Sequence, residues 1–564
     1  MNYLFIFTIG PVQPLIDNSR KGMDMYGGSK LLSETMGEAI QWIQKNSNCE
    51  VIFPLIIKDG SNKTSDIPNR MVVRFLSDRE EKLIKLAEEL TIHTRKYFLN
   101  RCVNILESSG IDGQGIVMAK NQLENFLETY WLYEKYDEND YGTAYQRLFE
   151  EIQAVKGVRM FSQINEPWGR KCALFPEFNS IFAKKIIGGR EIHYPKHVNP
   201  NYVFDLSEND VLRYAVKERE AISAIALVKR LYDRPETKLH SIRLMLLKSR
   251  VKDEVFIKLD IPQEDEIANA VYDMANSRIL STSREYPEEV LKNAATLYHY
   301  IQDNKITLAS YYALVKVDGD SMGKVFLAQK TEKQQQELSE RIAEFAKKAP
   351  QVILDYGGLS VFAGGEDFFG YLPLDTMFEC MNRLRQEFSE IVAVTTFSVG
   401  IAIAHVMQPL KEVAVMADKM EKAAKYESDL NVKEKNAFSI GIIKRNGETV
   451  IMPRYKLNQG NGLPEMEDMW QLILLINRSG CSRALFFQIS RLFKKMADDV
   501  KLPERKMAEV LIRNDVSNAF VDTSRVSKEE LVQRILKFYC EEYGVRGFLN
   551  TLNGIAFLAR EVKE

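Results

Sequence analysis

Apolar and polar residues alternate along the chain in a pattern that predicts two separate α/β units. Residues 1 to about 108 are expected to form a strand, a helix, two strands and another helix, because short apolar runs such as NYLFIFTI and EVIFPLII flank a long amphipathic stretch. Helical periodicity then dominates residues 115–155. The segment up to about residue 304 mixes helical patterns, such as EREAISAIALVKRLY, with polar loops.

The second α/β unit begins near Ile306 and has a clearer pattern. A strand over residues 311–317 precedes a helix whose start carries a capping box formed by Thr331 and Gln334. Two short strands, GLSVFA and FFGYL, are separated only by GGED, which predicts a tight hairpin because glycine adopts the positive φ that such turns require. A helix, the strand TTFSVGIAI and a last helix follow. This βαββαβ order with a trailing helix is that of a ferredoxin-like domain.

The last hundred residues are expected to be helical throughout. Runs such as MWQLILLI and ALFFQISRLF would provide the buried faces of a helical bundle. A chain of 564 residues is too long for one hydrophobic core, and roughly 150 residues per domain predicts about four domains. The expected fold class is therefore α/β (α+β), with several domains.

The composition narrows the possible functions. The chain is 45% hydrophobic and 27% charged, as in a globular protein, and its 76 Lys and Arg residues nearly balance 78 Asp and Glu residues. This balance argues against a free-standing nucleic-acid binder that relies on a surplus of cations, although a local patch or a partner could still bind RNA. The first apolar run has no basic leader, and Pro11 ends it well short of the ~20 residues of a membrane span. We therefore expect a cytoplasmic protein with no membrane contact.

The cysteines occur singly and form no CxxC pair, so their spacing indicates neither a disulfide framework nor a zinc site. Buried free thiols are the expected state of Cys49, Cys102, Cys172, Cys380, Cys481 and Cys540.

Three carboxylates are the strongest candidates for chemistry. In a ferredoxin-like sheet the first strand is expected beside the strand that leads into the central hairpin, so Asp318 would lie near Glu366 and Asp367. Like charges at such distances are tolerated only when a cation lies between them. Two Mg²⁺ or Mn²⁺ ions fit, because hard cations bind a few carboxylates together with substrate phosphates. Two such ions can support in-line displacement of pyrophosphate, so the chemistry implied is nucleotidyl transfer.

Neighbouring residues are candidates for binding a nucleotide. The turn DGDSMG offers backbone N–H groups for a triphosphate, the two glycines of GGED lie beside it, and the lysine that ends the last helix could neutralise phosphate charge. These candidates are Asp320, Ser321, Met322, Gly323, Gly364, Gly365 and Lys425. Taken singly, the same motifs are explained by a hydrophilic hairpin tip, a solvated loop or calcium fragment, and a lysine that complements a helix dipole. Their matching positions in one fold, about fifty residues apart, favour the functional interpretation.

The second unit resembles the polymerase/cyclase palm shared by GGDEF-type cyclases and the large subunit of type III CRISPR interference complexes. Near the N-terminus, FTIGPVQPLIDNSRKGMDMYGGSKLLS is similar to the opening of that large subunit in its Cmr subtype. So are QLENFLETYW, VKGVRMF, AIALVKRLY and LVKVDGDSMGKVF, in order along nearly the whole chain. A stand-alone GGDEF enzyme would lack the N-terminal motif.

The resemblance implies four domains. They are an N-terminal palm-like domain over residues 1–110, a mostly helical domain over 111–304, a catalytic palm over 305–455 with the GGED hairpin, and a C-terminal helical bundle over 456–564. Both palm-type domains would be ferredoxin-like.

The resemblance also implies a function. Such proteins bind two nucleotides between the palm-like domains and join ATP 3′ to 5′ into cyclic oligoadenylate when target RNA pairs with the guide CRISPR RNA, within a complex of several subunits. Some relatives instead attach AMP to S-adenosylmethionine, so the acceptor is open here. By this analogy the metals would be held by Asp318, Gly319, Glu366 and Asp367. The residues near the second nucleotide would be Gly27, Gly28, Ser29 and Lys30.

The chain departs from the family pattern in three ways. The usual GGDD is GGED, which puts a side chain one methylene longer at Glu366 and could change metal spacing and product length. An N-terminal HD nuclease domain is not found, so DNA cleavage by this subunit is not expected. The family's zinc-binding CxxC is represented by Cys172 followed by Phe175, so no zinc is expected.

Two other functions compete with the enzyme. The chain could be a non-catalytic scaffold whose degenerate palm only contacts guide and target RNA, or a free cyclase acting on GTP. Retention of three carboxylates favours the enzyme, because a scaffold has no reason to keep uncompensated charges together.

Overall fold

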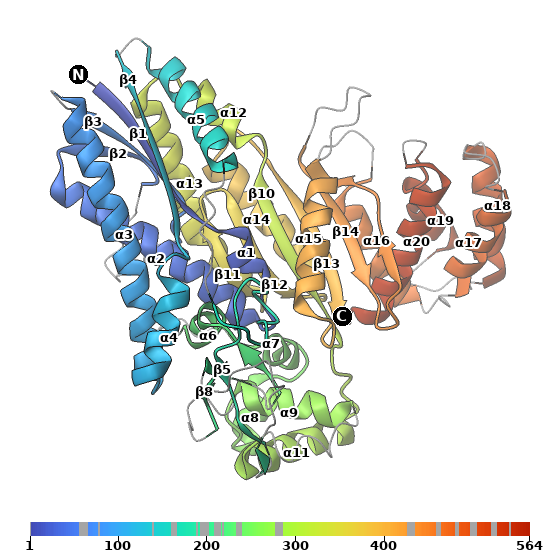
Figure 1. Cartoon of the computed structure of the whole chain (residues 1–564). Helices are drawn as coiled ribbons and strands as arrows, with labels where there is room; N and C mark the ends of the chain where they lie inside the picture. The colour runs from blue at the N-terminus through green and yellow to red at the C-terminus, as the bar shows by residue number, and fades with distance from the viewer. Residues whose placement is uncertain are drawn as a thin grey trace.

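The computed structural model describes residues 2–55, 66–76, 79–137, 140–158, 166–187, 190–191, 202–207, 216, 219–232, 240–276, 286–425, 435–457, 464–479, 484–496, 505–519, 527–540 and 543–563. Most of the strands gather in two sheets, with helices on their faces and at the two ends of the molecule (Figure 1). The predicted mixture of α/β units and helical domains is confirmed.

The first sheet has four antiparallel strands in the order β2-β3-β1-β4. They are β1 (Asn2–Gly10), β2 (Cys49–Phe53), β3 (Arg70–Leu76) and β4 (Glu128–Tyr136). The helices of this unit are α1 (Gln13–Asp17), α2 (Gly22–Asn46), α3 (Glu80–Ser108), α4 (Gly113–Leu123) and α5 (Tyr141–Gly157). Successive side chains of a strand face opposite sides, so Phe5 and Phe7 join the apolar cluster of α2 and α3, whereas Leu4 and Ile6 join that of α5.

The strand β4 corrects one prediction from the sequence. Helical periodicity was expected across residues 115–155, but residues 128–136 form a strand that pairs with β1 along its whole length. Its sequence, ETYWLYEKY, is rich in aromatic residues that favour strands, and nine consecutive pairs with β1 outweigh the local helical pattern. The expected domain limit at residue 110 therefore divides this sheet.

The second sheet contains the predicted GGED hairpin and the ferredoxin-like order of strands, β11-β12-β10-β13, continued by β14 and β15. Its strands are β10 (Tyr311–Gly319), β11 (Leu359–Gly364), β12 (Asp367–Pro373), β13 (Phe397–His405), β14 (Ala437–Ile443), β15 (Thr449–Ile451) and β16 (Tyr455–Lys456). One detail of the prediction is wrong: β10 lies beside β12, the strand that leaves the hairpin, and not beside β11. In this topology the pair β10–β12 joins the first and third strands of the ferredoxin-like unit.

Helices cover both faces of the second sheet. They are α12 (Met322–Ala328), α13 (Glu332–Asp355), α14 (Met377–Ile391) and α15 (Leu410–Lys425). The predicted cap of α13 is present, because the hydroxyl of Thr331 accepts a hydrogen bond from the Gln334 amide. Ala313 and Val315 of β10 face α13 and α14, whereas Tyr312 and Leu314 face the cluster that includes α15.

The two sheet units pack against each other reciprocally. Helix α2 of the first unit contacts β11 of the second, and α13 of the second contacts β2 of the first; likewise α1 contacts α15, and α12 contacts α5. The Leu55 amide donates to the Ser339 hydroxyl at 3.0 Å, and the Tyr141 hydroxyl donates to the Gln335 side chain at 2.6 Å. The edge at which strands β1 and β10 end is therefore shared by both units.

The segment between the sheets is made of short strands and helices. The strands are β5 (Phe182–Ala183), β6 (Ile186–Ile187), β7 (Arg190–Glu191), β8 (Phe204–Asp205) and β9 (Ala221–Ile222). The helices are α6 (Ala224–Leu231), α7 (Ile242–Lys248), α8 (Asp253–Leu259), α9 (Asp265–Ala275) and α11 (Glu288–Asp303). Helix α6 is the element of this segment that docks directly on α2.

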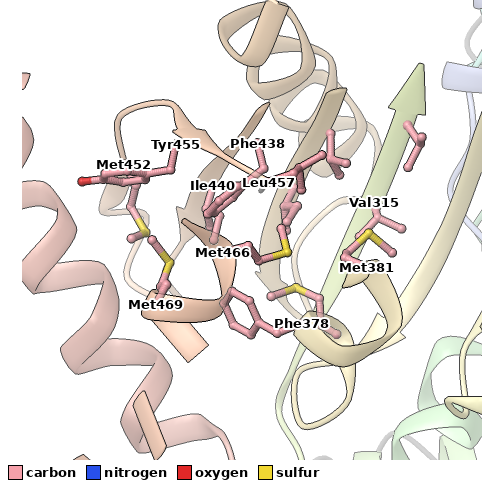
Figure 2. Close-up of a cluster of buried hydrophobic side chains, with 14 of the residues drawn as sticks. Val315, Phe378, Met381, Phe438, Ile440, Met452, Tyr455, Leu457, Met466 and Met469 are labelled. Carbon is pink, nitrogen blue, oxygen red and sulfur yellow. The ribbon is translucent and has the colours of Figure 1, made fainter. Parts of the chain in front are cut away.

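The C-terminal helices form the bundle expected from the sequence (orange to red in Figure 1). They are α16 (Met466–Ser479), α17 (Ala484–Met496), α18 (Arg505–Ala519), α19 (Lys528–Lys537) and α20 (Gly544–Glu561). Figure 2 shows how the bundle joins the second sheet: Met466 of α16 lies near Ile440 of β14 and Phe378 of α14, and Met469 of α16 lies beside Met452. Flexible methionine side chains fill such irregular gaps well.

Candidate functional site

The tip of the GGED hairpin lies against the first unit. Gly364 pairs with Asp367, so Gly365 and Glu366 form a two-residue turn, and Gly365 has the positive φ of +66° predicted for it. A Cβ added to Gly365 would lie 3.4 Å from Cγ of Pro68. The Ala363 amide, just before the tip, donates to the Asp66 carboxylate at 3.0 Å. The hairpin is thus held at the junction of the two sheet units.

Strand β10 brings Asp318 to the same edge. Val317 pairs with Phe368, so the next residues along the two strands, Asp318 and Asp367, continue this register at the end of the ladder. The side chain of Glu366 lies over the following residue: a Cβ added to Gly319 would be 2.8 Å from Cβ of Glu366. A residue without a side chain is therefore required at position 319, and the three predicted carboxylates belong to one edge of one sheet.

Cations from α15 and β10 neutralise part of this edge. Lys425, at the end of α15, forms an ion pair with Asp318 and a second one with Glu421 at 3.1 Å. Lys316 pairs with Asp418 and, at 3.5 Å, with Glu421. Burial and the charges of Lys435 and Lys316 lower the pKa of Lys425 to about 7, but two adjacent carboxylates oppose this shift by favouring the ammonium form. We therefore describe Lys425 as a charged partner of Asp318.

The Asp367 carboxyl has the opposite environment. Desolvation by the surrounding protein and the negative charge of Glu366 raise its pKa above the ordinary value of an aspartate. Because the Asp367 side chain is exposed, water screens part of this effect. Asp367 thus presents a carboxylate that a cation would stabilise and that points into solvent.

The carboxylates fit divalent ions in the kind of their donor atoms, although Asp318 is paired with Lys425. Among the residues that the structure describes, no three acidic, histidine or cysteine side chains are grouped closely enough to hold a metal, and Asp318 is turned toward Lys425. The donor set nevertheless fits Mg²⁺ or Mn²⁺ in kind, because it consists of carboxylates that repel each other and share one sheet edge. An ion would replace the ammonium of Lys425 as the counter-charge of Asp318. The roles predicted for Asp318, Gly319, Glu366 and Asp367 in metal binding remain predictions.

Asp320 has a structural role instead of the predicted contact with a nucleotide. Its buried carboxylate accepts hydrogen bonds from the Thr396 hydroxyl at 2.6 Å, the Ser398 hydroxyl at 2.7 Å and the Asn436 amide at 2.7 Å. These bonds tie the turn after β10 to β13 and to the start of β14. With its oxygens used in this way, Asp320 is a poor ligand for phosphate or metal.

The rest of the DGDSMG turn divides between core and surface. Met322 is buried in the apolar cluster of the second sheet, so its side chain is part of the core. Ser321 adopts the left-handed conformation, with φ of 56°, immediately before α12. Gly323 is exposed, and the nearest atom to a Cβ there would be Cε1 of Phe149 at 4.0 Å. Ser321 and Gly323 remain predicted nucleotide contacts, as do Gly364 and Gly365 at the hairpin.

The predicted second nucleotide site on α2 is occupied by protein contacts. A Cβ added to Gly27 would lie 2.1 Å from the carbonyl oxygen of Lys229, and one added to Gly28 would lie 2.8 Å from that of Leu15. Both glycines therefore permit close packing of α2 against α6 and α1. Lys30 forms an ion pair with Asp66, the residue that binds the hairpin backbone. Gly27 packs beneath α6 and Gly28 beneath α1; their contact with a nucleotide stays a prediction.

Two further residues of this region keep open roles. Ser29 is buried, and its hydroxyl has no hydrogen-bond partner in the part of the chain that the structure describes. Lys30 is half-buried and lies 5.2 Å from the centroid of the Tyr26 ring. Their predicted nearness to a second nucleotide remains a prediction.

One cation of the first unit that acts on the hairpin, Arg70, belongs to no motif in the sequence. The guanidinium of Arg70, at the start of β3, lies 5.3 Å from the ring centroid of Phe53 and 4.9 Å from that of Phe149. The positive charge of Arg70 partly offsets the raised pKa of Asp367 and that of buried Tyr145. Burial is the main cause of the raised pKa of Tyr145, and the negative charge of Glu366 adds to it. Arg70 could have been found only from the pairing of β1 with β3, which places it opposite Thr8, near the end of β1.

The cysteines behave mostly as expected. Cys102, Cys172 and Cys380 are buried free thiols, Cys49 and Cys540 are half-buried free thiols, and Cys481 lies outside the described residues. The sulfur of Cys172 accepts a hydrogen bond from the Ser223 amide at 3.3 Å. None of the described helices has the length and hydropathy needed to cross a bilayer.

Two family models match the chain. The model described as Cas10/Cmr2, second palm domain, matches residues 311–439, and the model described as CRISPR-associated protein Cmr2, N-terminal, matches residues 4–100. The chain is 21% identical over 551 residues to the CRISPR system Cmr subunit Cmr2 of Pyrococcus furiosus, with 79% of this chain and 62% of that protein covered. The chain thus spans less than two thirds of the length of this curated relative.

Solved structures share the fold. The Type III-B Cmr-beta structure in its apo state matches with a TM-score of 0.67 at 12% identity, covering 100% of this chain and 82% of that chain. The Type III-B Cmr-beta structure bound to cognate target RNA matches with a TM-score of 0.65 at 12% identity, covering 99% and 83%. At these identities the likeness shows the fold alone.

Proposed function

The chain belongs to the Cas10/Cmr2 family, and from this premise we propose that it is a metal-dependent nucleotidyltransferase that makes a nucleotide second messenger from ATP. It would do so as the large subunit of a type III CRISPR complex, after target RNA pairs with the guide RNA. The products considered are cyclic oligoadenylate and AMP joined to S-adenosylmethionine. The proposal assigns the protein to the cytoplasm, where the guide RNA and its target transcripts are found.

One observation carries the proposal. The ends of β10 and β12 meet beside the hairpin tip, so that Asp318, Glu366 and Asp367 share one sheet edge at the junction of two palm-type units. The contact between Gly319 and the Glu366 side chain rules out a wide gap between the two loop tips. A purely structural edge would not need carboxylates that repel each other.

Each residue has a distinct role in this proposal. Asp318, Glu366 and Asp367 would hold Mg²⁺ or Mn²⁺, which neutralises the charge that develops on the transferring phosphate and on the leaving pyrophosphate. Lys425, released from Asp318 when the ions bind, would neutralise a triphosphate oxygen. Asp320 would hold the turn after β10 in position through its bonds to β13 and β14. Asp66 would hold the hairpin through the Ala363 amide.

The alternative is a scaffold subunit that contacts guide and target RNA without catalysis. The ion pair between Asp318 and Lys425 favours it to some degree, because this pair neutralises one carboxylate without any metal. The exposed Asp367 and its repulsion by Glu366 favour the enzyme.

The test is an assay on the assembled complex with target RNA, labelled ATP and Mg²⁺. We expect labelled product from the wild type, and at least a hundredfold less from Asp367→Asn, because the amide keeps the shape but loses the charge that binds a metal. Glu379→Gln is the matched control, since it removes one exposed carboxylate from α14 of the same unit. Equal product from the wild type and from Asp367→Asn would show that the catalytic assignment is wrong.

The same assay identifies the acceptor. Product from ATP alone would indicate oligoadenylate synthesis, whereas product that appears only after S-adenosylmethionine is added would indicate AMP transfer to that molecule. Absence of product under both conditions, with target RNA bound, would favour the scaffold.

A further inference from the structure

We propose that Glu421 is a positioning residue for the transfer: it takes over the ammonium of Lys425 when Asp318 binds a metal ion, and so makes the Asp318 carboxylate available to that ion. The inference rests on the proposed function and adds a residue to it. Glu421 belongs to no motif in the sequence, and its role follows from the contact of α15 with β10.

Glu421 lies between two lysines near the end of α15. Only 8% of the residue's surface is exposed. Its Oε1 atom lies 3.1 Å from Nζ of Lys425, and its Oε2 atom lies 3.5 Å from Nζ of Lys316. A buried carboxylate is stable only when its charge is paired, and here each oxygen serves a different lysine. Glu421 is therefore placed to act on the lysine that pairs with Asp318.

The backbone fixes Glu421 in this place. A Cβ added to Gly400 of β13 would lie 2.2 Å from the amide nitrogen of Glu421 and 2.7 Å from its Cα, so a residue without a side chain is needed there. Gly400 is the residue that pairs with Lys316 across β10 and β13. The close approach of α15 to the sheet thus sets Glu421 beside Lys316. Lys425 follows Glu421 by one helical turn and lies on the same side of α15.

The charges of this group balance only when Asp318 has another partner. The ion pairs join two lysines to three carboxylates: Lys316 to Asp418 and Glu421, and Lys425 to Glu421 and Asp318. With Asp318 bound to a metal ion, two pairs remain, one between Lys316 and Asp418 and one between Lys425 and Glu421. Each lysine then still has a carboxylate. Glu421 thereby lowers the free energy needed to separate Lys425 from Asp318.

A contact with the first unit keeps Asp418 available for its part in this group. The Gln13 side chain of α1 donates to one carboxylate oxygen of Asp418 at 3.1 Å, and the other oxygen pairs with Lys316. Helix α1 also contacts α15 directly. Because Asp418 is held toward Lys316 in this way, Lys316 does not depend on Glu421 alone for its counter-charge.

A purely structural role of Glu421 makes a different prediction. If Glu421 only neutralised Lys316, removing both charges together would restore the wild-type properties. If Glu421 positions Lys425, the double variant Glu421→Gln with Lys316→Met would stay defective, because Lys425 would still lack its second carboxylate. The double variant also keeps the charge of the interior balanced, so it tests the inference even where Glu421→Gln alone unfolds.

The first measurement is the binding of Mn²⁺ to the full chain without nucleotide, followed by the electron paramagnetic resonance of the free ion. Binding that is lost in Asp318→Asn defines the site. We expect Glu421→Gln to weaken this binding about tenfold, since an interaction with a charged group is lost. The double variant with Lys316→Met should remain weakened about as much. Glu421→Asp, which keeps the charge, should recover most of the affinity.

A second background isolates the effect on Lys425. In Lys425→Met no ammonium competes for Asp318, so adding Glu421→Gln should change Mn²⁺ binding by less than about twofold. The control is Glu412→Gln, which removes an exposed carboxylate from the start of the same helix and should leave Mn²⁺ binding unchanged.

The activity of the assembled complex gives an independent measurement. With target RNA and ATP, the Mg²⁺ concentration for half-maximal product should rise about tenfold in Glu421→Gln, whereas the rate at saturating Mg²⁺ should fall less than about threefold. General damage to the fold would instead lower the rate at every Mg²⁺ concentration.

Three results would each overturn the inference and leave the transferase intact. They are wild-type Mn²⁺ binding in Glu421→Gln, full recovery in the double variant with Lys316→Met, and an equally large effect of Glu421→Gln in the Lys425→Met background. A wild-type chain with no Mn²⁺ site that depends on Asp318 would count against the proposed function itself.

Discussion

Replacing Asp320 distinguishes a structural carboxylate from a ligand for the nucleotide. In Asp320→Ala the Thr396 hydroxyl, the Ser398 hydroxyl and the Asn436 amide all lose the oxygen that they now bond at 2.6–2.7 Å. The Asp320 side chain is nearly inaccessible to solvent, with 3% of the residue's surface exposed, so these donors are not already shared with bulk water.

The expected loss of stability follows from these three bonds. A hydrogen bond to a charged group contributes about 1.5–3 kcal/mol, so the simple sum would exceed about 4.5 kcal/mol. The two hydroxyls can rotate to other acceptors, and a water molecule can enter the space left by the carboxylate, so we expect a smaller loss of about 3 kcal/mol. At 1.4 kcal/mol per factor of ten, this corresponds to roughly a hundredfold increase in the population of locally open states.

Hydrogen–deuterium exchange of the full chain measures this effect where it arises. Amides of β13 and β14 should exchange roughly a hundredfold faster in Asp320→Ala, without any nucleotide present, whereas Asp318→Asn should leave them unchanged because Asp318 takes no part in these bonds. Ser398→Ala, which removes one of the three donors and leaves the carboxylate in place, should have a smaller effect. Wild-type exchange rates in Asp320→Ala, together with a loss of ATP affinity, would refute the structural role and restore the original prediction of a nucleotide contact.

The other predictions concern the contact of α2 with α6 and the tie at the hairpin. Burial lowers the pKa of Lys229 to about 7, from 10.5 for a free lysine. Between these pH values the unfolded chain therefore binds more protons than the folded chain. The free energy of unfolding should then rise with pH from about 7 to 10, by at most about 1.4 kcal/mol per pH unit. In Lys229→Met a urea titration at each pH should show that this rise is lost, and an unchanged slope would contradict the assignment. Gly27→Ala should destabilise the protein by about 2 kcal/mol or more in the same titration. Gly142→Ala is the control and should be neutral or slightly stabilising, because a Cβ there meets nothing within 4 Å. Equal effects of the two substitutions would be inconsistent with close packing of α2 against α6. Asp66→Asn should break the ion pair with Lys30 and speed hydrogen–deuterium exchange of the β11 amides about tenfold. Exchange of these amides at the wild-type rate would disprove the role of Asp66 at the hairpin.

The sequence determined the elements whose signals are local. Short apolar runs and the paired glycines predicted β10 and the GGED hairpin, and a polar residue at the cap predicted the start of α13. The placement of three carboxylates at one sheet edge followed from strand order alone, even though β10 was paired with the wrong strand of the hairpin. The strand β4 was missed because pairing with β1, more than a hundred residues away, decides its conformation.

The tertiary structure alone decided what the side chains of these elements do. Asp320 and Asp318 are two residues apart, yet one is saturated by hydrogen bonds from β13 and β14 while the other pairs with Lys425, more than a hundred positions along the chain. Gly27 and Gly28, which in the sequence resembled part of a nucleotide site, are small because α6 packs on the first and α1 on the second. The physical reason is that backbone conformation follows largely from neighbouring residues, whereas the partner of a charge or a hydroxyl is set by whichever distant segment the fold brings within about 3 Å.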